Sequence, residues 1–312
     1  IQVVATAVDP FDARDKIIEH IPDVMLCDVQ MPKMNGIEFI RRLMPQYPLP
    51  IIVISSISGI VFEAIGAGAI DFVAKPYIKS KKNKEEFIDE IINKIKVASR
   101  AKILVNRANK NSKDKGVIKK TNINKERIIA IGASTGGVEA IHRILKQLPK
   151  NMPGILIVQH IPPVFSHMFA ERLNGSVNMR VREAKTGDYV ENGLVLIAPG
   201  DKHMSIRKME NGYRVRCFEE DKVNGHCPSV DVLFDSVAEE VGEDAIGVIL
   251  TGMGYDGAKG LLKIRRKGGQ TIGQDEKSSV VYGMPRAAFN VGAVGKQIPL
   301  DNIAKEIYSM IV

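Results

Sequence analysis

The sequence predicts an α/β protein with two domains, each built around a parallel β-sheet. Short apolar runs alternate with segments of helical spacing in both halves of the chain, which is typical of repeated strand–helix units. An Asn- and Lys-rich stretch without this periodicity separates the halves. With 312 residues and 45% hydrophobic content, the chain is long enough for two cores. We expect domains at 1–105 and 127–312, joined by a flexible basic linker at 106–126.

The first domain places three reactive side chains at the ends of its expected strands. Asp28, Ser55 and Lys75 each end an apolar run. The carboxyl ends of parallel strands meet at one edge of a sheet, so these side chains should converge there. The expected strands are 3–5, 24–28, 51–55 and 72–75, and the expected helices are 11–20, 36–44 and 59–67.

The residues at these strand ends resemble the motifs of a response-regulator receiver domain, which has a flavodoxin-like sheet. The motifs are D-V-Q-M-P-K-M-N-G from Asp28, S-S from Ser55 and K-P from Lys75. The resemblance implies that Asp28 accepts a phosphoryl group, Ser55 is the switch hydroxyl and Lys75 pairs with the phosphate. Receivers begin with a strand ending in an acidic pair that binds Mg²⁺, whereas this sequence begins at what resembles the second strand. We therefore expect an amino-terminally truncated receiver sheet, with Mg²⁺ bound for phosphorylation only if that acidic pair is present.

A final receiver helix is expected before the linker. Asn83 could cap it, with Glu86 at its third position. An apolar stripe along this helix could pack on the domain core or dock a partner. The stripe comprises Phe87, Ile91, Ile95 and Ala98.

Positive charge is concentrated around the linker. The chain has a net charge of +8, yet residues 79–127 alone hold 16 Lys and Arg against 6 Asp and Glu. The remainder is therefore slightly acidic. This stretch is also nearly devoid of the aromatic side chains that bind nucleic acid by stacking. We expect no nucleic-acid partner and interpret the stretch as a solvated connector that could steer docking to an acidic partner.

The sequence predicts a cytoplasmic protein. No apolar run approaches the roughly 20 residues that span a bilayer, so we expect no membrane insertion, and we expect no secretory signal. Cys27, Cys217 and Cys227 have neither disulfide-framework nor zinc-site spacing, and we expect no metal ligands among them.

The second domain repeats the strand–helix alternation and is predicted to be a doubly wound α/β domain. An antiparallel hairpin insertion is expected from 194–198 and 213–218, which are separated by Asn211-Gly212. The other expected strands are 128–132, 154–160, 245–251 and 271–274, and helices are expected around Gly137, Phe165, Val230 and Asp256.

Ser134 is the candidate nucleophile. The buried strand I-I-A-I-G-A leads into S-T-G-G and then a helix, so Ser134 lies in a tight turn that a substrate carbonyl can approach closely. A phosphate-binding turn or a merely structural turn remain alternatives. A dinucleotide fingerprint would need glycine at position 134, which weakens that reading.

His160 and Asp256 are the candidate partners of Ser134. A serine nucleophile needs a base, and His160 ends a strand at the same sheet edge. His20 lies in the first domain, His142 is expected to face solvent, and the remaining histidines are expected in polar loops or at element ends. Asp256 follows a strand in the turn T-G-M-G-Y-D-G and could orient the base, although it could instead be only a helix N-cap. Backbone N–H groups at Met253 or near Thr135 could bind an oxyanion.

The whole chain resembles the chemotaxis protein-glutamate methylesterase family, CheB. The resemblance rests on the receiver, the linker and the motifs G-A-S-T-G-G, V-Q-H-I-P, P-S-V-D-V-L-F, T-G-M-G-Y-D-G and G-M-P-R-A-A. It implies that Ser134 is the nucleophile, His160 the base and Asp256 the orienting acid, with Met253 near the oxyanion site. Tyr255 stands where the family usually has asparagine.

This resemblance implies hydrolysis of glutamyl methyl esters on methyl-accepting chemotaxis receptors, with release of methanol, and deamidation of receptor glutamines. It further implies that a chemotaxis histidine kinase phosphorylates the receiver and relieves its blockage of the active site. Catalysis should need no cofactor. The competing hypothesis is a response regulator whose second domain only binds a nucleotide or a partner.

Overall fold

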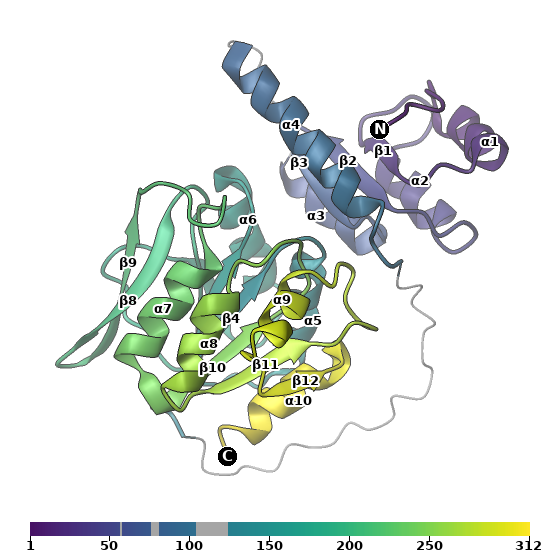
Figure 1. Ribbon diagram of the computed structural model, residues 1–312. Coiled ribbons are helices and arrows are strands. Elements are labelled where there is room, and N and C mark those ends of the chain that lie inside the picture. Colours follow the sequence, from purple (N-terminus) through teal and green to yellow (C-terminus); the bar gives the residue numbers. More distant parts are fainter. Residues whose placement is uncertain (57, 76–80, 104–123) are drawn as a thin grey trace. The chain divides into compact units, whose positions relative to one another are not determined.

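The computed structural model describes all residues except 57, 76–80 and 104–123. Most of the predicted linker and the proline after Lys75 therefore lie outside the described residues. The chain divides into two compact units, Ile1–Asn109 and Lys110–Val312 (Figure 1).

Three parallel strands form the sheet described in the first unit, with the strand of 51–55 in the middle. Ile51, Ile52 and Val53 are fully buried in this unit's core. Their positions agree with three of the four predicted strands to within a residue. The strands are β1 (Met25–Asp28), β2 (Ile51–Ser55) and β3 (Asp71–Ala74).

The helices of the first unit begin where the sequence supplies caps. The Asp9 carboxylate accepts hydrogen bonds from the N–H groups of Phe11 and Asp12, and the Asn35 side chain caps the next helix in the same way. Asn83 lies inside the last helix, which begins two residues before it, so the predicted start there is wrong. The helices are α1 (Pro10–His20), α2 (Gly36–Leu43), α3 (Ser58–Ala67) and α4 (Lys81–Ala98).

Residues 3–5 do not form the predicted strand. No described strand pairs with them, and the side chains of Val3 and Val4 are exposed. The β-propensity of a valine-rich run reflects packing in a sheet, and without a hydrogen-bonded neighbour the run stays irregular.

A larger parallel sheet forms the centre of the second unit. Its strands are β4 (Ile128–Ala133), β5 (Gly154–Gln159), β6 (Arg180–Glu183), β7 (Leu194–Ile197), β10 (Ala245–Ile249), β11 (Gln270–Gln274) and β12 (Lys296–Ile298). Over the described residues, their order is β12-β11-β10-β4-β5-β7-β6, and all neighbours run parallel. This confirms the predicted α/β class.

The sheet of the second unit is doubly wound, and its direction of winding changes at β4. The chain passes from β4 to β5 toward one edge, and from β10 to β11 toward the other. Since such crossovers are right-handed, the helices of the two halves cover opposite faces. The carboxyl ends of β4 and β10 therefore lie at the topological switch point, which is where α/β sheets typically bind ligands.

Helices cover both faces of this sheet (Figure 1). α7 and α8 pack against each other, and α5 packs against α10. The helices are α5 (Gly137–Gln147), α6 (Pro163–Asn174), α7 (Val230–Glu240), α8 (Ala258–Arg266), α9 (Met284–Asn290) and α10 (Leu300–Ser309), with a 3₁₀ turn η1 (Gly242–Asp244).

The antiparallel hairpin is present, but one of its two arms differs from the prediction. β9 (Gly212–Phe218) pairs with β8 (His203–Met209), and Asn211 lies in the turn between them. The apolar run of 194–198 instead forms β7, which pairs with β5 and β6 inside the parallel sheet. Its four residues are all buried, and a strand buried on both faces loses the alternating pattern that marks a hairpin arm.

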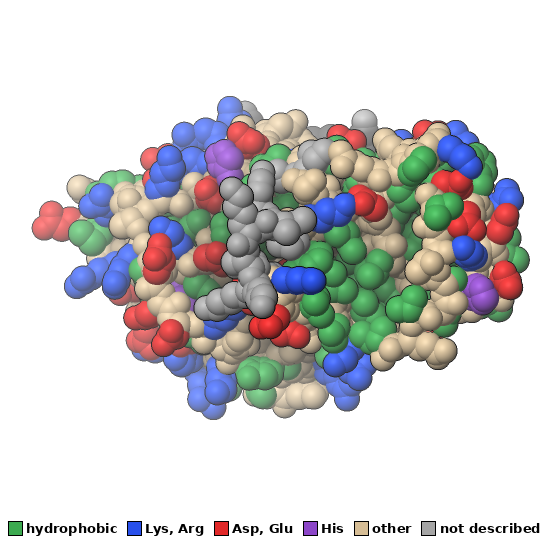
Figure 2. Space-filling view, turned by 90° about the horizontal axis from the view of Figure 1, so that it is seen from above, with side chains coloured by type: hydrophobic (Ala, Val, Ile, Leu, Met, Phe, Trp, Pro, Cys, Tyr) green, Lys and Arg blue, Asp and Glu red, His purple; other side chains and the backbone are tan. Residues whose placement is uncertain are grey.

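Charges of both signs are mixed on the surface. Figure 2 shows Lys and Arg side chains interspersed with Asp and Glu on the face that it presents. Among the described helices, none is both long and apolar enough to cross a membrane.

Candidate active site

The first unit brings its three predicted site residues to one sheet edge. Asp28 ends β1, Ser55 ends β2 and Lys75 follows β3. The Lys75 ammonium forms an ion pair with the Asp28 carboxylate, and the Lys75 N–H donates to the Ser55 carbonyl at 2.9 Å. Within the described ranges, no group of three His, Cys, Asp or Glu side chains could hold a metal ion.

Ser134 lies at the switch point of the larger sheet, directly after β4. Its N–H donates to the Thr251 carbonyl at 3.0 Å, which ties it to the end of β10. Its carbonyl accepts from Gly137 N at 2.7 Å and from Gln159 Nε2 at 2.9 Å, which ties it to α5 and β5. Gly136, two residues on, has φ 78°, a left-handed conformation that favours glycine. The backbone of Ser134 is thus held by three elements.

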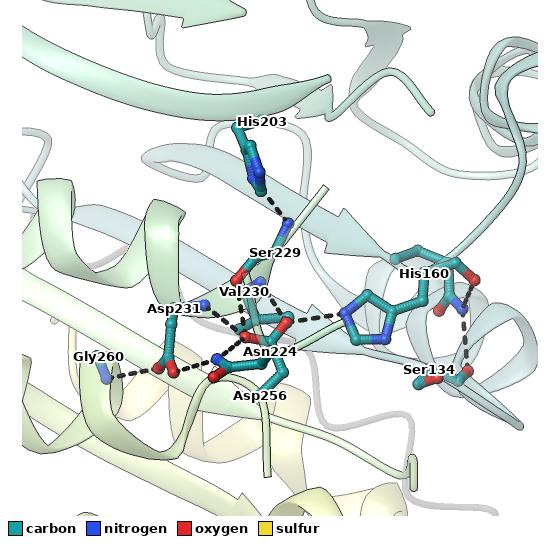
Figure 3. Close-up of polar contacts among 10 residues, drawn as sticks. Ser134, His160, His203, Asn224, Ser229, Val230, Asp231, Asp256 and Gly260 are labelled. Carbon is teal, nitrogen blue, oxygen red and sulfur yellow. Dashed lines mark hydrogen bonds and ion pairs between the residues drawn. The ribbon is translucent and has the colours of Figure 1, made fainter. Parts of the chain in front are cut away.

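His160 and Asp256 meet at the same edge. His160 follows β5, and its Nε2 lies 2.9 Å from Asp256 Oδ2 (Figure 3). Both side chains are buried, with exposures of 8% and 1%. The other ring nitrogen, Nδ1, is buried and has no hydrogen-bond partner among the described residues. Since Asp256 accepts the Nε2 proton, Nδ1 keeps a free lone pair and can act as a base.

The Asp256 carboxylate is surrounded by hydrogen-bond donors. Besides His160, Oδ2 accepts from the Val230 N–H at 2.7 Å. Oδ1 accepts from Ser229 Oγ at 2.7 Å, Asn224 Nδ2 at 2.8 Å and the Asp231 N–H at 3.2 Å. The side chain therefore caps α7 in addition to holding the imidazole. The alternative role as a cap of the following helix is wrong, because Gly257, with φ 89°, is the N-cap of α8.

Electrostatics keep Asp256 ionised. Burial alone would raise the pKa of its carboxyl, but the hydrogen bond and charge of His160, with the hydrogen bonds from Asn224 and Ser229, hold that pKa well below its usual range. The imidazolium that forms when His160 accepts a proton would therefore face a fixed negative charge.

Ser134 and His160 are neighbours but do not hydrogen-bond. The His160 N–H donates to the carbonyl of Ala133, the residue before Ser134, at 3.1 Å. In Figure 3 the imidazole lies between Asp256 and Ser134. The Ser134 hydroxyl forms no hydrogen bond to a described residue. Such contacts are often long without substrate and shorten when it binds.

The turn after β10 lies next to Ser134. An added Cβ at Gly252 would lie 2.6 Å from Ser134 Cβ and 3.2 Å from Ser134 N, so there is no room for a side chain at this position beside Ser134. No described residue accepts a hydrogen bond from the Met253 N–H, which leaves it available to an oxyanion. The Thr135 carbonyl accepts from Thr251 Oγ1 at 2.9 Å, so this residue also ties β4 to β10. Tyr255 is exposed.

Among the other histidines, His142 and His167 depart from their predicted surroundings, whereas His203, at the start of β8, and His226, in the loop before α7, lie where the sequence predicts. His142 is mostly buried rather than solvent-facing, and burial lowers the pKa of its imidazole. His167 lies on α6 rather than in a loop. His203 is fully buried, and the His226 ring stacks on that of His160, with centroids 3.7 Å apart and an interplanar angle of 10°.

Similarity to known proteins agrees with this geometry. Residues 129–307 match the family model of the CheB methylesterase, and residues 1–85 match that of the response regulator receiver domain. The chain belongs to the CheB methylesterase family.

Full-length relatives support membership of the CheB family. The chain is 53% identical to the protein-glutamate methylesterase/protein-glutamine glutaminase 2 of Syntrophomonas wolfei, over 100% of this chain and 90% of that protein. It is 45% identical, with the same coverage, to the protein-glutamate methylesterase/protein-glutamine glutaminase of Syntrophotalea carbinolica. The crystal structure of the Thermotoga maritima CheB methylesterase catalytic domain is similar, with a TM-score of 0.58 and 37% identity, over 59% of this chain and 98% of that one.

Sequence reasoning missed three residues around the CheB-type site. Asn224 and Ser229 bind the Asp256 carboxylate, and His226 covers His160. All three lie in the loop before α7. The Asn-Gly pair at 224–225 signals a tight turn, but nothing in the local sequence shows what that turn contacts.

Proposed function

We propose that this chain is a serine esterase that hydrolyses glutamyl methyl esters on chemotaxis receptors and deamidates receptor glutamines. The observation that carries the proposal is the buried His160–Asp256 hydrogen bond beside Ser134, because it leaves a basic ring nitrogen next to a serine in a tight turn.

The proposed reaction proceeds through an acyl-enzyme. His160 Nδ1 takes the proton of the Ser134 hydroxyl as its oxygen attacks the ester carbonyl. The resulting oxyanion is bound by backbone N–H groups, for which Met253 is the proposed donor. The imidazolium then gives its proton to the methoxy oxygen, and methanol leaves. Water, deprotonated by His160, hydrolyses the acyl-enzyme and releases glutamate. With a glutamine substrate the leaving group is ammonia. This chemistry needs no metal or organic cofactor.

The proposed partners are chemoreceptors, whose cytoplasmic helices are the substrate, and a histidine kinase as phosphodonor. The proposed location of this chain is the cytoplasm. Asp28 is the proposed phospho-acceptor, with Lys75 as the cation that pairs with the phosphoryl group and Ser55 as the switch hydroxyl. Phosphorylation of the first unit is proposed to relieve inhibition of the second.

A fluorophosphonate probe tests the proposed nucleophile. Incubation of the full chain should label one serine, in the peptide that contains Ser134, and labelling should abolish methanol release from a glutamyl methyl ester peptide. An unlabelled Ser134 together with tight nucleotide binding would instead support a binding module.

A further inference from the structure

The loop of residues 221–229 carries a four-residue turn that reaches the candidate active site. Val223 and His226 exchange two backbone hydrogen bonds, of 3.1 and 3.0 Å. Between them, Asn224 and Gly225 have φ values of 54° and 83°, and positive φ at both central residues is the pattern of a type I′ turn. We call residues 223–226 the 223–226 turn.

His203 fixes the base of this loop. Its Nε2 lies 3.0 Å from the Asp221 carbonyl, and its Nδ1 accepts the Ser229 N–H at 3.2 Å. This imidazole is completely buried at the start of β8. One buried side chain therefore bonds both ends of the loop. Figure 3 shows its contact with Ser229.

The two polar side chains of the 223–226 turn contact the two members of the His160–Asp256 pair. Asn224 donates one amide hydrogen to Asp256 Oδ1 at 2.8 Å and the other to Asp231 Oδ2 at 2.7 Å. The His226 ring stacks on the His160 ring. Asp231 is held in turn by the Gly260 N–H at 2.7 Å.

We propose that the 223–226 turn is a positioning element for catalysis, in which His226 fixes the plane of the His160 imidazole and Asn224 fixes the Asp256 carboxylate. The proposal rests on the function proposed above. His226 and Asn224 are positioning residues, because they act through His160 and Asp256.

The charge state of His226 suits this role. The groups that face it are His160, Asp256 and Lys222, and burial, followed by the charge of His160, lowers the pKa of His226 to about 4. At neutral pH it therefore presents an uncharged ring face to His160. An uncharged His226 ring adds no charge repulsion when His160 becomes an imidazolium in the transition state, so the stacked contact can persist.

Substitutions in the full chain test the proposal. His226→Ala and Asn224→Ala should each lower kcat for methanol release by about tenfold, which corresponds to about 1.4 kcal/mol, with KM nearly unchanged. His226→Phe, which keeps a flat ring, should stay within about threefold of the unsubstituted chain. Glu220→Ala, an exposed change in the segment leading into the loop, is the matched control and should have no effect.

A proton NMR signal separates positioning from a general loss of structure. The His160 Nε2–H that bonds Asp256 should give a low-field resonance, which weakens or shifts in His226→Ala and Asn224→Ala and is retained in His226→Phe and Glu220→Ala. Thermal unfolding shows whether each variant remains folded.

Two results would overturn the inference. One is unchanged kcat in both alanine variants, and the other is a fall in kcat that His226→Phe does not rescue while the low-field resonance stays in place. Fluorophosphonate labelling of the unsubstituted chain separates these outcomes from failure of the proposed function. If Ser134 is labelled, the proposed function stands and only the positioning role is in question. If Ser134 is unreactive, the proposed function itself fails.

Discussion

His160 hydrogen-bonds to Asp256 through Nε2, with 2.9 Å between the ring nitrogen and Oδ2. This contact assigns the other ring nitrogen, Nδ1, to the proposed proton transfer with Ser134. The residues come from turns after three adjacent strands, in the order β10-β4-β5. Ser134 follows the middle strand, and the His160 side chain extends from the turn after β5 to Asp256 in the turn after β10.

Ser134→Ala should abolish turnover. Removing the nucleophile of a serine triad lowers kcat by roughly 10⁶-fold, because no other group can form the acyl-enzyme. Methanol release from a glutamyl methyl ester peptide measures the effect. Ser176→Ala, whose hydroxyl only bonds backbone carbonyls at the end of α6, serves as the control. Substantial methanol release by the Ser134 variant would remove the assignment.

Asp256→Asn should damage both catalysis and stability. The carboxylate accepts five hydrogen bonds, so an amide nitrogen there must face groups that are themselves donors. We expect kcat to fall by about 10⁴-fold through loss of the correct His160 tautomer. The free energy of unfolding should fall by about 1–3 kcal/mol for each donor left unpaired.

Methanol release and denaturant unfolding measure these two effects. Asp301→Asn is the matched control, because Asp301 is an exposed partner of Arg143, and such surface pairs contribute less than about 1 kcal/mol. Equal stability of the Asp256 and Asp301 variants would argue against the hydrogen-bond network.

Gly252→Ala should displace the nucleophile without removing it. The added Cβ would lie 2.4 Å from Met284 Sδ and 2.6 Å from Ser134 Cβ, so the turn after β10 or the serine has to shift. A displacement of about 1 Å at a reacting group costs roughly 100-fold in rate. The rate of fluorophosphonate labelling measures it. Gly175→Ala adds the same methyl group where the nearest atom is 3.7 Å away, and it should react like the unsubstituted chain.

The second unit should lose stability between pH 6.5 and pH 4. The pKa of His226 is lowered from 6.5 to about 4 in the folded state, so in this range the unfolded chain binds a proton that the folded chain does not. The free energy of unfolding therefore falls as the pH falls, by up to roughly 3 kcal/mol for this group. Burial of His142 acts in the same direction.

Denaturant unfolding at a series of pH values measures this loss. In His226→Phe, the free energy of unfolding should depend less steeply on pH than in the unsubstituted chain. The pH dependence that remains includes the contribution of His142. Asp256 does not contribute to the change between pH 6.5 and pH 4. Because its pKa is lowered in the folded state, the stability that it contributes is lost only below pH 3.8. Identical pH dependence with and without His226 would contradict the expectation.

Much of the architecture is predictable because strand–helix alternation and glycine-rich turns are local signals. They located the strands that carry Ser134, His160 and Asp256 to within one or two residues. The run of 194–198 was misassigned because a fully buried parallel strand shows no alternation.

The surroundings of the candidate site were not predictable from local sequence. Asp256 precedes α8 in the sequence, which suggests that it caps that helix. Its carboxylate instead accepts hydrogen bonds from the first N–H groups of α7. Likewise, His226 has no periodic or motif context that marks it, and its contact with His160 arises only when the 223–226 turn packs against the residues that follow β5 and β10. Both relationships join segments about 25 to 65 residues apart, which no local pattern encodes.

Asp256 does two jobs with one carboxylate, since it anchors the start of α7 and aligns the imidazole. Under the proposed mechanism, a mutation at this position is therefore exposed to selection twice, once for a folded domain and once for turnover. Few replacements can meet both requirements. If another residue took over the orientation of His160, the N–H groups at the start of α7 would also need a new hydrogen-bond acceptor.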